Sequence, residues 1–194
     1  MLYPNSDVKQ YIQQLSEASC EALQLRVGQP IQSVMAPSAD LRLGSSTVTT
    51  QSVSIRVGVR EFLVIENDWA DTPVEYHDYY FLEVSIADRP KDVTVYVQES
   101  APCWSYVMDH FCLRLGGKST IKCVDVLEDK YKGEKEAVKY DAALIFHLEN
   151  GVSFVIAREQ SISGFMEIYH SEDAVREFSD ENPVRIKFRY NKSV

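Results

Sequence analysis

Acidic and aromatic side chains are concentrated in one stretch of the sequence, residues 61–88. The net charge of the chain is −9, and this stretch contains no lysine or arginine, so the remainder is close to neutral. Tyrosines and a tryptophan alternate with acids in its central part, NDWADTPVEYHDYY. Rings supply buried area and carboxylates attract cations, so this composition is typical of a surface that recognises a basic partner. The eight carboxylates are Glu61, Glu66, Asp68, Asp71, Glu75, Asp78, Glu83 and Asp88.

The centre of this stretch is the predicted partner-binding site. One competing interpretation is a solvated loop whose aromatic side chains fold back onto the core. Another makes four of its residues, Asp68, Asp71, Glu75 and His77, a site for a divalent cation or for acid–base catalysis, since carboxylates bind hard cations. The predicted partner-binding residues are Asp68, Trp69, Asp71, Glu75, Tyr76, His77, Asp78 and Tyr79.

Other motifs lack the context that their chemistry requires. Gly117-Lys118-Ser119 resembles the end of a phosphate-binding P-loop, but that motif needs glycine at the position of Cys112 and a helix after the loop. His110 lies near Cys112, yet no tight pair of further ligands accompanies them as a zinc site would require. The sequence therefore predicts no nucleotide, metal or other cofactor, and no catalytic residue is assigned.

The four cysteines, Cys20, Cys103, Cys112 and Cys123, are predicted to be reduced thiols that hold no metal. They form no C-x-x-C pair, and the N-terminus has neither the basic nor the apolar segment of a signal peptide. The expected compartment is therefore the cytoplasm, where disulfides are rare. His147 lies in an apolar run and is interpreted as a hydrogen-bonded residue of the core or its rim.

Composition argues against two classes of partner. Nucleic-acid binding requires a basic face, and this chain is acidic. No apolar run approaches the roughly 20 residues that a membrane-spanning helix needs. A length of 194 residues, 45% of them hydrophobic, is typical of a single folded domain over residues 1–194. The sequence leaves the oligomeric state open.

A β-hairpin over residues 141–159 is the predicted centre of the fold. Asn150-Gly151 joins its two apolar runs, and this dipeptide favours a two-residue type I′ turn. A turn closed there pairs Phe146 with Val155. Because both faces are apolar, the hairpin should lie inside a sheet that is covered on both sides.

The predicted fold class is α+β, mainly an antiparallel β-sheet forming a sandwich or curved sheet, with an N-terminal amphipathic helix and one or two short helices. The N-terminal helix is expected over residues 6–26 and the β-rich core over residues 46–194, while residues 28–46 give weak signals. A short helix is expected over 100–117, with an irregular strand as the alternative, and another after Ser171. A charged loop is expected at 128–139. Alternating segments predict strands at 53–59, 61–66, 80–86, 93–97 (the partner of 80–86), 120–127 and 184–190.

These observations favour a non-catalytic, cytoplasmic binding protein that presents an acidic-aromatic surface to a basic protein partner. An immunity protein or antitoxin that neutralises a cationic nuclease has the same charge logic, which is an analogy of electrostatics. One alternative is a metal-assisted hydrolase that uses the Asp/Glu/His cluster. Another is a structural or assembly subunit that associates through its edge strands.

Overall fold

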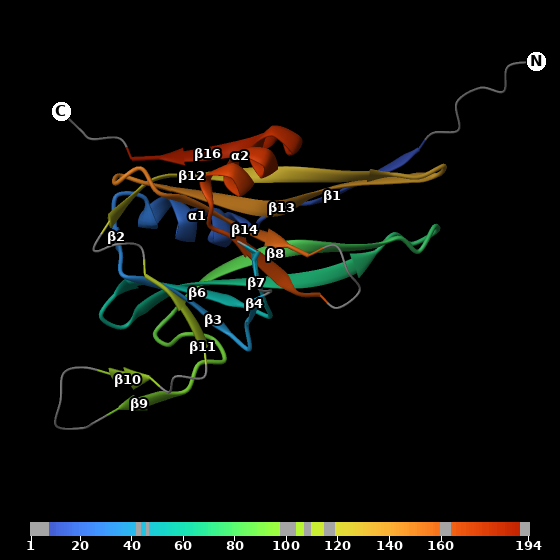
Figure 1. Cartoon of the computed structure of the whole chain (residues 1–194). Helices are drawn as coiled ribbons and strands as arrows, with labels where there is room; N and C mark the ends of the chain where they lie inside the picture. The colour runs from blue at the N-terminus through green and yellow to red at the C-terminus, as the bar shows by residue number, and fades with distance from the viewer. Residues whose placement is uncertain are drawn as a thin grey trace, which may run out of the picture.

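In the computed structural model of the chain, two mainly antiparallel β-sheets lie face to face, with one helix between them and a second on the outside (Figure 1). The predicted fold class, α+β with a curved, mainly antiparallel sheet, is confirmed. Neither helix in the described part of the chain is long and apolar enough to span a membrane. The structure describes residues 8–41, 44–45, 47–97, 104–106, 110–114, 119–159 and 164–190.

The larger sheet contains nine strands. Two of them lie off its main path: β1 (Lys9–Gln13) pairs in parallel with β13, and β2 (Pro30–Ile31) pairs with the start of β12. The main path runs through β16 (Val184–Arg189), β12 (Ser119–Lys132), β13 (Glu136–Leu148), β14 (Ser153–Arg158), β15 (Met166–Tyr169), β5 (Thr47–Thr50) and β4 (Asp40–Leu41).

The smaller sheet has five strands, and its inner face closes the core. Helix α1 (Glu17–Arg26) contributes the fully buried Leu23 between the two sheets. A separate pair joins β9 (Val95–Val97) to β10 (Trp104–Tyr106). The order of the five strands is β11 (His110–Leu113), β3 (Ser33–Pro37), β6 (Val53–Gly58), β7 (Glu61–Asp71) and β8 (Asp78–Ala87).

The predicted hairpin is the centre of the larger sheet, and both of its faces are buried. On the inner face, Phe146 stacks on Phe154 with ring centroids 5.0 Å apart. On the outer face, helix α2 (Glu172–Glu181) brings Val175 against Ile145. Ser171 caps α2 as predicted, accepting a hydrogen bond from the backbone N–H of Ala174.

The pairing within this hairpin differs by one residue from the prediction. Phe146 pairs with Phe154, and Val155 lies opposite Ile145 on the outer face. The N–H of Leu148 donates to the carbonyl of Val152, so the loop has three residues, and its last residue, Gly151, has φ of +86°. A three-residue loop that ends on a left-handed glycine is a common alternative to the two-residue turn.

The predicted N-terminal helix is wrong over its first half. Residues 9–13 form β1 because an edge of β13 is open to them, and Tyr11 reaches across to Glu136. The helix begins only after Ser16, whose side chain accepts from the N–H of Ser19. Its length is therefore ten residues.

The helix predicted over 100–117 is also wrong in the residues that are described. They form the strands β10 and β11, so the alternative that the sequence left open is correct for them. Strand β11 pairs with β3, a buried strand within residues 28–46, where the sequence signals are weak. The sequence predicted that residues 93–97 pair with residues 80–86. Strand β9 instead pairs with β10.

The charged segment 128–139 is not a loop. Strands β12 and β13 continue through it as a long hairpin, and the turn occupies only residues 133–135. Its strand character was hidden because charged residues, among them Lys130, Lys132 and Lys139, occupy its exposed positions.

The alternation of residues 184–190 predicts that the apolar residues face the core and that the basic residues face solvent, and the last strand, β16, departs from this pattern. Val184 and Tyr190 are exposed, because β16 is an edge strand and its ends extend past the core. Arg185 and Lys187 were expected to face solvent, but they form ion pairs with the buried carboxylates of Asp141 and Asp125.

Candidate partner-binding site

The predicted site forms the end of the β7–β8 hairpin, residues 68–80, which we call the acidic hairpin end. Its turn is held by three hydrogen bonds around the buried Thr72. The N–H of Tyr76 donates to the Thr72 carbonyl (2.9 Å), and His77 donates its N–H to the Thr72 hydroxyl (3.1 Å). The N–H of Thr72 donates back to the carbonyl of His77 (3.1 Å). Tyr76 has φ of +51°, an uncommon conformation for this residue type that the surrounding bonds maintain.

Two carboxylates join this turn to the turn between β12 and β13. Glu75 accepts hydrogen bonds from the backbone N–H groups of Glu134 and Glu136, both at 2.9 Å, and a longer one from Lys135. Glu136 accepts in return from the N–H groups of Val74 and Glu75, both at 2.9 Å. Each turn therefore supplies the carboxylate that satisfies the backbone of the other.

Glu136 is held as a carboxylate by this arrangement. Burial alone would raise its pKa, but the N–H groups of Glu75 and Val74 and the hydroxyls of Tyr11 and Thr72 outweigh burial and lower the pKa to about 2. Glu136 is therefore ionised at neutral pH, and its negative charge strengthens the hydrogen bonds that join the two turns.

The structure divides the eight predicted residues into an exposed group and an inward group. Glu75 and His77 are half-buried, and Tyr79 is buried against the ring of Tyr140. His77 stacks flat on Tyr131, with ring centroids 3.4 Å apart. The exposed residues are Asp68, Trp69, Asp71, Tyr76 and Asp78.

A cavity of about 590 Å³, here called the tyrosine groove, lies beside the turn. Sequence reasoning missed its far wall, because those residues come from the segment taken for a charged loop and from the end of β14. The groove is lined by Tyr76, His77, Asp78, Tyr79, Tyr80, Asp129, Lys130, Tyr131, Tyr140 and Arg158.

Arg158 lines both the tyrosine groove and a second cavity. Its guanidinium forms an ion pair with Asp129, donates to the Tyr140 hydroxyl at 2.6 Å and lies 4.6 Å from the centre of that ring. Burial raises the pKa of Tyr140 to about 12, so this hydroxyl stays protonated. Because Arg158 and Asp129 line both cavities, the two cavities are neighbours on one surface of the protein.

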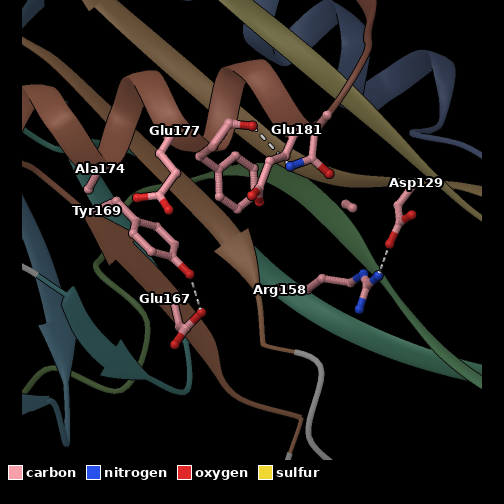
Figure 2. Close-up of a pocket in the computed structure, with 10 residues that line it drawn as sticks. Asp129, Arg158, Glu167, Tyr169, Ala174, Glu177 and Glu181 are labelled. Atoms are coloured by element: carbon pink, nitrogen blue, oxygen red, sulfur yellow. Dashed lines mark hydrogen bonds and ion pairs between the residues drawn. The ribbon is translucent and has the colours of Figure 1, made fainter.

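The second cavity, called the helix pocket, measures about 600 Å³ and lies under α2 (Figure 2). Glu177 and Glu181 enter it from the helix, and Glu167 enters from β15, where it accepts a hydrogen bond from Tyr169. Together the two cavities are lined by five carboxylates and by two cations, Lys130 and Arg158. The combined surface is therefore negative.

The proposed cation or acid–base cluster of Asp68, Asp71, Glu75 and His77 does not converge. Among the described residues these four are not a group whose ligand atoms approach one another. Glu75 is engaged by backbone amides and His77 by the ring of Tyr131. The geometry gives this set no shared point at which a cation or a substrate could be held.

Comparison of the chain with protein-family models, with curated proteins and with solved structures finds no match.

Proposed function

We propose that this protein is a non-catalytic, cytoplasmic binding protein whose acidic hairpin end docks a basic protein partner. The observation that carries the proposal is a pair of exposed rings on the acidic hairpin end, Trp69 (60% exposed) on β7 and Tyr76 (73% exposed) in the hydrogen-bonded turn. Large aromatic side chains in rigid positions are the usual anchors of protein interfaces, because little conformational freedom is lost when they bind.

The charges around these rings support a cationic partner. Glu61 pairs with Arg26 and Glu66 with Lys91, so two acids of this region are already neutralised. No lysine or arginine in the described part of the chain forms a salt bridge with Asp68, Asp71 or Asp78. These three exposed carboxylates leave a negative potential that would steer a basic protein to the surface.

The tyrosine groove offers a place for a cationic side chain of that partner. A guanidinium or ammonium group entering it meets tyrosine rings and Asp78, and both cation–π contact and charge pairing favour such a group. A protein that covers a cationic surface in this way would act as a neutraliser, in the manner of an immunity protein or antitoxin.

The test is a binding measurement on the full-length protein with an arginine-rich peptide as the probe. Replacing Asp68, Asp71 and Asp78 with serine should slow association several-fold and flatten its salt dependence. Trp69→Ala or Tyr76→Ala should mainly speed dissociation.

The matched control replaces three exposed acids elsewhere, Glu21, Asp88 and Glu149, with serine and so changes the net charge equally. Association with the control should stay close to the wild-type rate. Equal losses in the two triple variants would show that only net charge matters, and the proposed site would then be wrong.

A further inference from the structure

A second group of chemically active side chains lies on the outer face of the larger sheet, away from the acidic hairpin end. Cys123 on β12 is directly opposite His147 on β13, and His147 is directly opposite Ser153 on β14. Asp125 follows Cys123 by two residues and shares its face, since side chains alternate along a strand. The possible ligand atoms of Cys123, Asp125 and His147 all lie within 4.8 Å of one another.

Asp125 is an unusual residue in this group, because it is buried and only partly satisfied. It is 4% exposed, and its Oδ1 has no hydrogen-bond partner among the residues that the structure describes. Its other oxygen, Oδ2, accepts from Lys187 Nζ at 2.6 Å. A buried carboxylate oxygen without a donor is costly, so its presence indicates a missing partner.

The ring of His147 is held so that one nitrogen faces this carboxylate. Nδ1 lies 2.9 Å from the Ser153 hydroxyl, which leaves Nε2 toward Asp125 Oδ2 at 3.5 Å. That separation is long for a hydrogen bond, which is usually below about 3.2 Å. It is close to the roughly 3.3 Å that separates two nitrogen or oxygen ligands of one tetrahedral zinc ion, given bond lengths of about 2.0–2.1 Å.

We propose that Cys123, Asp125 and His147 bind one divalent cation of the zinc class. A thiolate and an imidazole select zinc over magnesium or calcium, which prefer all-oxygen sites. The hydroxyl of Ser153 orients the His147 ring in the way that supporting residues orient metal-bound histidines. Three protein ligands leave the fourth position of a tetrahedral site for water.

Without metal, the net effect of the surroundings is to raise the pKa of the Cys123 thiol above its ordinary value. Burial and the nearby Asp125 raise the pKa of Cys123, while Lys187, Arg189 and Lys122 act in the opposite direction. The metal displaces the thiol proton and adds positive charge where two acidic groups converge. Half-exposed His147 gives the ion a route from solvent. The sequence prediction that no cysteine holds metal rested on spacing along the chain, which does not show these cross-strand neighbours.

The experiment uses full-length protein, stripped with a chelator and titrated with Co²⁺ as a spectroscopic probe and then with Zn²⁺ in competition. We expect one equivalent to bind with a thiolate-to-cobalt absorption band that zinc abolishes. Cys123→Ser should remove this band, and His147→Gln should weaken binding at least tenfold. The matched control, Cys112→Ser, changes another partly buried free thiol and should leave the titration unchanged.

Two further variants separate metal binding from folding. Ser153→Ala should weaken binding about tenfold while the circular dichroism spectrum is retained, because only the orientation of His147 is lost. Lys187→Met should tighten binding several-fold, since it removes a cation that competes for Asp125. Wild-type protein without a thiolate band, or a band that survives Cys123→Ser, would overturn the proposal.

Discussion

Glu75 and Glu136 each bind the backbone amides of the turn that carries the other. Glu75 belongs to the smaller sheet and Glu136 to the larger one, so this exchange closes the two sheets together at the end that presents Trp69 and Tyr76. Tyr11 adds a hydrogen bond to Glu136 from the first strand. The acidic hairpin end is therefore fixed by contacts between segments that are far apart in sequence.

The first prediction concerns the Glu75 carboxylate. Glu75→Gln removes the negative charge of this side chain, so the hydrogen bonds that it accepts from backbone amides become weaker. We expect a loss of about 1–3 kcal/mol in the free energy of unfolding. Urea denaturation measures this loss. Glu134→Gln is the matched control, because Glu134 is exposed in the same turn, and its effect should stay within about 0.5 kcal/mol. Equal effects of the two variants would show that the contacts of Glu75 contribute nothing.

The second prediction is a pH dependence that originates at Glu136. Its pKa falls from 4.5 to about 2 on folding, so the unfolded chain binds more protons than the folded protein between these values. The stabilisation is complete above pH 4.5 and is lost as the pH falls toward 2. The stability difference between wild type and Glu136→Gln should therefore be constant near neutral pH and shrink below pH 4.5. A difference that stays constant down to pH 3 would contradict this assignment.

The third prediction concerns Gly133, which has no room for a side chain. A Cβ atom at this position would overlap the Glu75 carboxylate. We expect Gly133→Ala to destabilise the protein because it expels Glu75 from the turn. The cost in a Glu75→Ala background should be clearly smaller, and a double-mutant cycle by urea denaturation measures this coupling. Additive effects of the two substitutions would show that they act independently.

The fourth prediction tests the core of the central hairpin. Phe146 is fully buried and stacked on Phe154, so Phe146→Ala should cost about 3–5 kcal/mol through lost transfer energy and the cavity that remains. Phe146→Leu fills most of this space and should cost markedly less. Thermal or urea unfolding distinguishes the two variants, and similar losses would indicate that the core relaxes around the deletion.

The parts of the fold that the sequence predicted were those with strong local signals. The central hairpin has two apolar runs and a turn dipeptide, and α2 has a serine cap followed by helical spacing. The pairing in the hairpin was shifted because a loop of two or three residues fits the same Asn150-Gly151 pair. Strand β1 was missed because its residues are extended only through pairing with β13, which lies more than a hundred residues later in the sequence.

The candidate site was predicted in its exposed half only. Asp68, Trp69 and Tyr76 could be found from composition, because no core requirement explains them. The far wall of the groove, including Tyr131 and Arg158, depends on how two hairpins lie side by side. Glu75 was predicted to bind a partner, and nothing local in the sequence shows that its carboxylate instead binds backbone amides of a distant turn.

The requirement for glycine at position 133 also has an evolutionary consequence. A larger residue there displaces the Glu75 carboxylate from the amides that it binds, so a lineage that acquires one no longer benefits from glutamate at position 75. We therefore expect the two positions to change together in natural variants. A glycine at 133 should accompany glutamate at 75, and a lineage that loses one should soon lose the other.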